Sequence, residues 1–322
     1  MSQDINPASL HRLAGQQASD NRPFEELGTA SVITFTEGPT CDNAGNVFFT
    51  DVRGNKIMKL APTGELSIFR YPANYANGLV CTADDLLWAC EEGEDGNPCV
   101  SVTNLATRSR ETIVSQVEGK RLRGPKDITF DSQGRVYFTD GSRPFFLEPF
   151  ADPALHRPGS GVYRIDPDRQ VTEIIGPGIA VEPNGICVSP DDKTIYVIEN
   201  NPRENGLRLL LAFDLGENGD VSNRRVVHDF KLGRSGDGMS VDGVGRLWVA
   251  AGLNRGRGLA ETLDNPAGIY VFEPDGTLID ILAIPEDSVT NNCFGGPDLR
   301  TLYVTAGKTL FSTRVDVPGT RK

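Results

Sequence analysis

Glu37, Asn184 and Asp237 occupy the same position in three copies of a repeated segment, and they offer two carboxylates and one amide oxygen. Such hard oxygen donors suit calcium, magnesium or manganese. A divalent cation held by three side chains keeps open positions, where it can polarise a substrate carbonyl and lower the pKa of a bound water. Taken singly, Asn-Gly and Asp-Gly are ordinary turn dipeptides. Their recurrence at one position of the repeat favours a metal-assisted hydrolytic site.

The repeated segment has the pattern of strand, turn and strand. In the copy from Asn184 to Glu199, a short apolar run precedes a Pro-Asp-Asp-Lys turn and the β-rich run Ile195-Tyr-Val-Ile198. Successive copies start 40 to 58 residues apart, as from 37 to 77 and from 126 to 184. The polar residues that open the six copies are Glu37, Asn77, Lys126 or Asp127, Asn184, Asp237 and Asn292.

This spacing is typical of β-propellers, since a four-stranded blade needs roughly 40 to 50 residues. We therefore predict an all-β fold, a six-bladed β-propeller with four antiparallel strands per blade. Equivalent positions of all blades point to one end of the channel, so the six openers should converge there. We expect the ring to close by pairing strands at 29–35 and 309–315. The predicted domains are an extension at 1–30, a propeller at 31–316 and a tail at 317–322.

The composition limits which binding partners and which cellular compartment are expected. The chain has 322 residues and a net charge of −12, and this negative charge argues against nucleic-acid binding. No apolar run is long enough to predict a membrane span. Its six cysteines form no Cys-x-x-Cys pair, so a thiolate zinc site is not indicated. We interpret them as reduced core residues. With no visible signal peptide, a cytoplasmic location follows.

Two insertions, at 141–158 and 253–266, interrupt the period between a second and a third strand. The second strand returns to the mouth that carries the openers, so the insertions should rim the site as substrate walls or lids. The alternative is packed loops that bind nothing. His156 in the first insertion could reach a substrate, although a surface-loop histidine is the simpler interpretation. The sequence has no nucleophile elbow, Walker loop or dinucleotide fingerprint.

Four motifs together resemble the gluconolactonase/regucalcin (senescence-marker protein) family. They are Thr36-Glu-Gly-Pro39, Pro183-Asn-Gly-Ile186, Gly236-Asp-Gly-Met239 with Gly245-Arg-Leu-Trp-Val-Ala250, and Asn292-Cys-Phe-Gly-Gly296 with Leu302-Tyr-Val-Thr305. The resemblance extends over residues 32 to 314. It implies a six-bladed propeller that hydrolyses a small-molecule sugar lactone with a divalent metal.

The resemblance also implies roles for individual residues. Glu37, Asn184 and Asp237 would be the metal ligands, and Asp237 would also be the general base that acts on metal-bound water. The implied cofactor is one divalent cation, calcium first, with magnesium, manganese and zinc as alternatives. The side chains expected to bind sugar hydroxyls or a carboxylate are Asn77, Asn292, Arg123 and an insertion arginine (Arg143, Arg255 or Arg257).

The third copy departs from the family pattern. Where the family usually has Asn-Asp, this chain has Lys126-Asp127. Lys126 could hydrogen-bond a substrate oxygen, stabilise a developing oxyanion or pair with a carboxylate. It could also weaken metal binding or take the metal's place. Asp127 would support the site from behind or pack structurally.

Two other functions stay open at this point. Hydrolysis of a phosphorus ester or an aryl ester on the same framework, as in squid-type fluorophosphatases, would be favoured by the apolar residues Phe145, Phe146 and Phe150. A non-catalytic propeller that binds a metal, a ligand or a protein would be favoured by Lys126.

Overall fold

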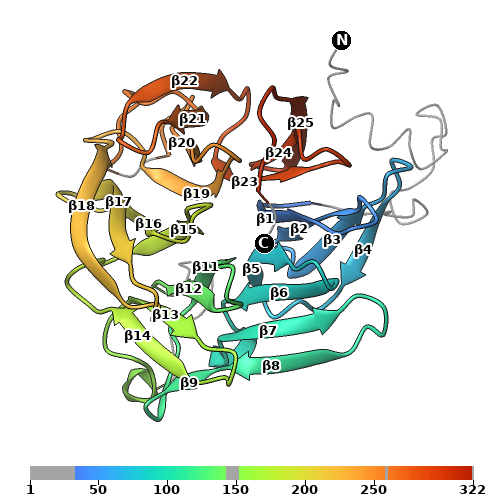
Figure 1. Cartoon of the computed structure of the whole chain (residues 1–322), viewed down its shortest axis with the longest axis vertical. Helices are drawn as coiled ribbons and strands as arrows, with labels where there is room; N and C mark the ends of the chain where they lie inside the picture. The colour runs from blue at the N-terminus through green and yellow to red at the C-terminus, as the bar shows by residue number, and fades with distance from the viewer. Residues whose placement is uncertain (1–32, 143–151, 258–259, 321–322) are drawn as a thin grey trace, which may run out of the picture. The chain divides into compact units, whose positions relative to one another are not determined.

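The computed structural model describes residues 33–142, 152–257 and 260–320. The chain divides into two compact units, Met1–Ile33 and Thr34–Lys322. Within the second unit, six antiparallel sheets follow one another along the chain and surround a common centre, as Figure 1 shows. The predicted six-bladed β-propeller is confirmed.

The blades contain the following strands, in chain order. Blade one has β1 (Thr36–Cys41), β2 (Val47–Asp51), β3 (Lys56–Leu60) and β4 (Leu66–Arg70), and blade two has β5 (Ala76–Cys81), β6 (Leu86–Glu91), β7 (Cys99–Asn104) and β8 (Arg110–Val114). Blade three has β11 (Pro125–Phe130), β12 (Val136–Asp140), β13 (Gly161–Ile165) and β14 (Val171–Ile175), and blade four has β15 (Pro183–Val188), β16 (Thr194–Asn200), β17 (Arg208–Leu215) and β18 (Val221–Asp229). Blade five has β19 (Gly236–Val241), β20 (Leu247–Ala251), β21 (Gly268–Phe272) and β22 (Leu278–Ala283), and blade six shows β23 (Val289–Gly295), β24 (Thr301–Ala306) and β25 (Thr309–Arg314).

Short elements connect these blades. A hairpin of β9 (Gln116–Val117) and β10 (Lys120–Arg121) precedes blade three, and 3-10 turns occur at Glu94–Gly96 and Pro153–Leu155. In the described part of the chain, no helix has the length and apolar character that crossing a membrane requires.

The first and last blades meet through β1 and β23. Thr36 N donates to Gly307 O at 2.8 Å, and Thr290 Oγ1 donates to Thr36 O at 2.9 Å. The predicted C-terminal closing strand corresponds to β25. Its predicted partner at 29–35 lies mostly outside the described residues, and residues 33–35 are not in a strand.

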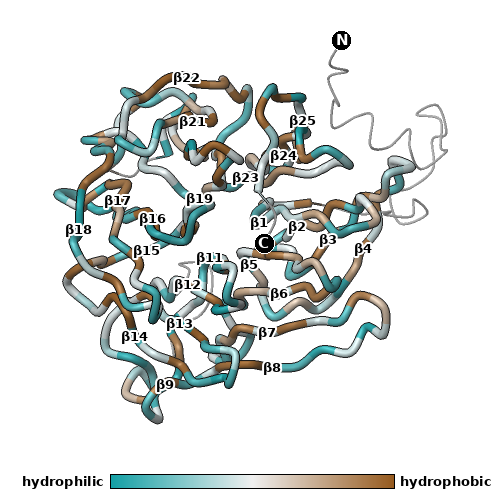
Figure 2. Tube along the Cα trace, in the orientation of Figure 1, coloured by the Kyte–Doolittle hydropathy of each residue, from teal (hydrophilic) through white to brown (hydrophobic). Residues whose placement is uncertain are grey.

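Apolar side chains fill the spaces between neighbouring blades. Between blades four and five, Ile198, Phe230 and Phe272 are almost fully buried in one cluster. The fourth strands form the outer edge and are largely exposed, as in β18. Figure 2 shows apolar stretches recurring around the ring. The six cysteines are thiols and not half-cystines, and five of them are buried.

The strand register defines equivalent positions in the six blades. The first residue of each innermost strand pairs near the end of the second strand, and these pairs are Thr36–Asp51, Ala76–Glu91, Pro125–Asp140, Pro183–Glu199, Gly236–Ala251 and Val289–Ala306. The next residues along the chain therefore share one position, and they are Glu37, Asn77, Lys126, Asn184, Asp237 and Thr290. Lys126, not Asp127, opens blade three. The prediction that Asn292 opens blade six was wrong by two residues, because the polar run 290–292 allows the alignment to slip.

Acids near the end of the second strand hold the segment that leads into the innermost strand. The bonds run from Phe35 N to Asp51 Oδ1 (3.0 Å), from Gly124 N to Asp140 Oδ1 (2.8 Å) and from Glu182 N to Glu199 Oε1 (3.0 Å). In blade five the equivalent residue is Ala251. Blade five therefore lacks this carboxylate.

The C-terminal residues pack at the other end of the innermost strands. Gly243 N donates to Pro318 O at 2.8 Å, and Thr320 Oγ1 donates to Val241 O at 3.3 Å. Thr320 also borders a small axial cavity of about 150 Å³ that all six innermost strands line. The predicted tail at 317–322 thus contacts blade five as far as residue 320.

Candidate active site

Glu37, Asn184 and Asp237 come together from blades one, four and five. Asn184 Nδ2 donates to Asp237 Oδ1 at 2.5 Å. Burial raises the pKa of Glu37 well above its ordinary value, and the negative charges of Asp237 and Asp127 raise it further. Burial also raises the pKa of Asp237, against the opposing effect of nearby cations. The mouth of the propeller therefore places buried carboxylates close to one another.

Asp127 and Asn291 meet across the axis and form the floor of this mouth. They follow the openers of blades three and six, and Asn291 Nδ2 donates to Asp127 Oδ2 at 3.5 Å. The other four blades have glycine there, and a Cβ at any of them would come closer than 3.0 Å to the neighbouring blade; the glycines are Gly38, Gly78, Gly185 and Gly238. Only two side chains thus reach the axis at this level. Burial raises the pKa of Asp127 to about 7.

Lys126 is engaged in an ion pair on the same rim. Its Nζ lies 2.5 Å from Glu92 Oε1, and Asn77 Nδ2 donates to the same oxygen at 2.8 Å. The Lys126 stem lies beside Gly141, where a Cβ would be 3.2 Å from Lys126 Cγ. Among the roles weighed for Lys126, the structure shows the pairing with a carboxylate. Because an ammonium has three N–H donors, hydrogen atoms remain for a substrate oxygen.

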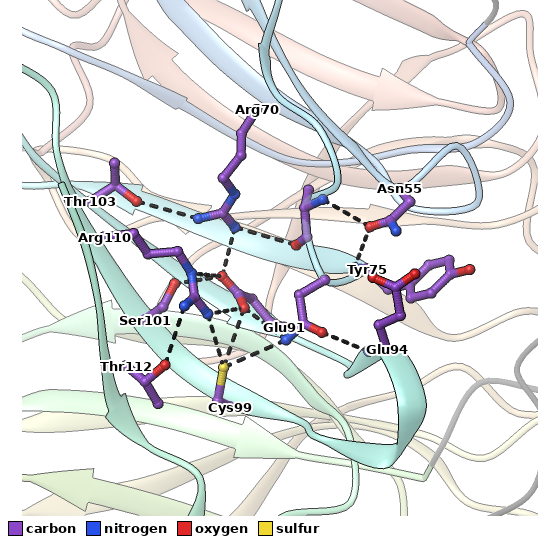
Figure 3. A network of polar contacts seen from close by, with 12 residues as sticks. Asn55, Arg70, Tyr75, Glu91, Glu94, Cys99, Ser101, Thr103, Arg110 and Thr112 are labelled. Carbon is purple, nitrogen blue, oxygen red and sulfur yellow. Dashed lines mark hydrogen bonds and ion pairs between the residues drawn. The ribbon is translucent and has the colours of Figure 1, made fainter. Parts of the chain in front are cut away.

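Glu92 is supported from behind by its neighbour Glu91. Figure 3 shows the Glu91 carboxylate between two arginines. Arg70 Nη2 lies 2.6 Å from Oε1, and Arg110 donates to both oxygens, with Nη2 on Oε2 and Nε 3.1 Å from Oε1. Ser101 Oγ donates to it at 2.5 Å. Burial would raise the pKa of Glu91, but the two arginines outweigh it and the pKa is lowered. The end of β6, and hence Glu92, is anchored by a charge cluster around the fully buried Glu91 carboxylate.

Three predicted substrate-binding residues contact the protein instead. Arg123 Nη1 donates to Arg157 O at 3.0 Å. The ring nitrogens of His156 lie 3.3 Å from the backbone oxygens of Asp152 and Gly96. Asn292 Nδ2 donates to Trp248 O at 2.8 Å. None of these bonds connects the three side chains to Glu37, Asn184 or Asp237.

Of the three candidate insertion arginines, Arg255 and Arg257 lie among the described residues. Arg143 lies outside the described residues, as do Phe145, Phe146 and Phe150. Arg257 pairs with Glu261, and its Nη1 lies 3.2 Å from Ser288 Oγ. The charges of Arg257 and Glu261 both act on Asp237. The second insertion therefore borders the mouth.

Sequence reasoning missed Arg234, Glu92 and Asn291. Arg234 is 1% exposed, and its Nη2 pairs with Asp237 Oδ2 while Nη1 donates to Val289 O at 2.7 Å. Arg234 precedes strand β19, and outside a strand no alternation of apolar and polar residues indicates which side chains face inward. A charged residue three positions before an opener was the available signal.

The family description SMP-30/gluconolactonase/LRE-like region matches residues 35–308. The chain belongs to this family. It is 28% identical over 319 residues to the gluconolactonase of Zymomonas mobilis, with 92% of this chain and 82% of that protein covered. It is 27% identical over 284 residues to the regucalcin of Oryctolagus cuniculus, with 84% and 83% covered. The solved gluconolactonase of Xanthomonas campestris matches with a TM-score of 0.72 at 25% identity, over 89% of this chain and 86% of that one.

The divalent cation implied by the likeness to the SMP-30/gluconolactonase family fits the donors at the mouth. Glu37 and Asp237 offer carboxylate oxygens and Asn184 an amide, a set that matches hard cations. Among the described residues, no three His, Cys, Asp or Glu side chains form a metal cluster, so the amide is needed to complete the set. Burial raises the pKa of Glu37, and the neighbouring negative charges of Asp237 and Asp127 add to it; a cation bound here would offset both effects.

Proposed function

We propose that this protein opens the ester ring of a small sugar lactone at the mouth of the propeller and uses one divalent cation, calcium first. The observation that carries the proposal is the convergence of Glu37, Asn184 and Asp237 in a chain related to gluconolactonases over nearly its whole length. A pentonolactonase of Haloferax volcanii, 33% identical over 181 residues, supports sugar lactones as the substrate class.

The protein's own groups supply binding, orientation and proton transfer. Glu37, Asn184 and Asp237 would hold the cation, which supplies Lewis-acid polarisation and a more acidic water. Asp237 accepts the proton of the attacking water at Oδ1, since Oδ2 is held by Arg234. Lys126 donates a hydrogen bond to the developing oxyanion. The water oxygen bonds to the carbonyl carbon, the C–O bond of the ring then breaks, and the ring oxygen leaves as an alkoxide that takes up the proton held by Asp237.

Substrate hydroxyls would be bound around this centre. Asn77 and Lys126 already share Glu92 as an acceptor, so this group presents donors and an acceptor on one side of the mouth. Asp127 supports the floor. The six cysteine thiols support a reducing, cytoplasmic location as part of the proposal.

The proposal is tested by following hydrolysis of a panel of aldonolactones with a pH indicator. Chelated protein is compared with and without added Ca²⁺, Mg²⁺, Mn²⁺ or Zn²⁺. Turnover that returns only with metal supports the proposal in full. Turnover that survives thorough chelation would mean that Lys126 replaces part of the metal's role. Absence of turnover on every lactone would refute the lactonase function, and phosphotriester and aryl-ester substrates would then be tried.

A further inference from the structure

Arg234 is the largest of the fully buried side chains in the described part of the chain. A buried guanidinium is unfavourable unless a charged partner and hydrogen bonds compensate it. Its two terminal nitrogens have separate partners, with Nη2 on Asp237 Oδ2 and Nη1 on Val289 O at 2.7 Å. Arg234 therefore ties the opener of blade five to the innermost strand of blade six.

Among the described residues, the other carboxylates near Arg234 form no ion pair with it. Glu37 acts on it only through its charge. Blade five has Ala251 where blades one, three and four carry the acid of the second strand. Glu261 from the insertion acts electrostatically on Arg234 but forms its ion pair with Arg257. The arrangement leaves Asp237 as the ion-pair partner of Arg234.

This contact makes the two oxygens of Asp237 unequal. Oδ2 is held by a guanidinium whose plane is fixed at its other end by the backbone of blade six. Oδ1 is directed toward Asn184, 2.5 Å from Nδ2. The carboxylate thus presents a single oxygen to the mouth.

We propose that Arg234 is a positioning residue that holds Asp237 Oδ2, so that Oδ1 alone serves the cation and the attacking water. The inference rests on the proposed function and deepens it. Loss of a group that orients a ligating carboxylate typically lowers metal affinity or activity 10- to 100-fold. Freeing Asp237 to rotate should therefore lower both Ca²⁺ affinity and kcat, with KM changing much less.

The test compares Arg234→Met and Arg234→Lys with Arg135→Met as a matched control. Arg135 is also buried and also joins a carboxylate to a backbone oxygen, with 2.6 Å to Asp131 Oδ2 and 2.6 Å to Glu217 O. Its carboxylate is not an opener. Each variant is examined by calorimetric titration with Ca²⁺ alone, by lactone kinetics and by thermal unfolding, with rates corrected for the folded fraction.

We expect Arg234→Met to lower Ca²⁺ affinity and kcat each by about 10- to 100-fold, and Arg234→Lys to recover part of the loss. Arg135→Met should be less stable and otherwise like the wild type. If Arg234→Met does not fold, the Lys variant, which keeps the charge, carries the comparison. Unchanged or tighter Ca²⁺ binding with wild-type kcat would overturn this inference alone. A wild-type protein that neither binds Ca²⁺ nor hydrolyses lactones would overturn the proposed function, and this inference with it.

Discussion

Replacing Glu91 by glutamine should destabilise the propeller strongly, although Glu91 is not among the residues proposed to bind the substrate or the cation. The glutamate is fully buried and carries one negative charge between Arg70 and Arg110. Removing one partner of a buried ion pair costs about 3–5 kcal/mol, because the remaining charge is left uncompensated. The Arg110 side chain is 33% exposed, and water screens its share, so we take the lower end, about 3 kcal/mol.

Glu111→Gln is the matched control in the same blade. Glu111 forms a two-pronged pair with Arg169, but both side chains are more than half exposed. Such exposed pairs contribute little to stability, because water and salt screen their charges. Urea unfolding of both variants, followed by tryptophan fluorescence and by circular dichroism, measures the difference. Free energies of unfolding within about 1 kcal/mol of each other would refute the view that burial makes the Glu91 cluster a structural anchor.

Three further results are expected. Asp237→Ala should remove lactone hydrolysis while the circular dichroism spectrum stays native, and full hydrolysis by this variant would contradict the assigned role. Gly185→Ala should lower stability by about 3 kcal/mol, because its Cβ would overlap Asp237 O, whereas Gly256→Ala, with nothing within 4 Å, should not; equal melting temperatures would contradict this. Burial raises the pKa of Glu199 to about 7, so its contribution to stability is complete below the unfolded pKa and is lost as the pH rises through 7. Relative to Glu199→Gln, the wild type should lose stability between pH 5 and pH 8 in urea titrations, and parallel pH curves would argue against it.

The blades and most of their openers could be predicted because they follow from local patterns. Each opener stands directly before an apolar run, and the period repeats, so Glu37, Asn184 and Asp237 were found together. The opener of the sixth copy was predicted wrongly because Thr290, Asn291 and Asn292 are all polar. Only the strand register shows which of them is the opener.

Two ion pairs at the mouth could not be predicted in the same way. Lys126 reaches Glu92 from another blade, and no fixed spacing in the chain indicates this pairing. Arg234 lies three residues before Asp237, but that spacing alone does not show that its side chain turns inward. His156 has the chemistry of a catalytic residue, yet its ring contacts backbone oxygens, which its residue type does not reveal.

The contact between Asp127 and Asn291 affects how substrate and product can reach and leave the mouth. It spans the axis below the openers, and Thr320 borders the cavity on the far side, so the passage along the axis is interrupted. Lactone, water and hydroxy-acid product would then share one entrance. A product that has not yet left blocks the next substrate, so the product should inhibit competitively.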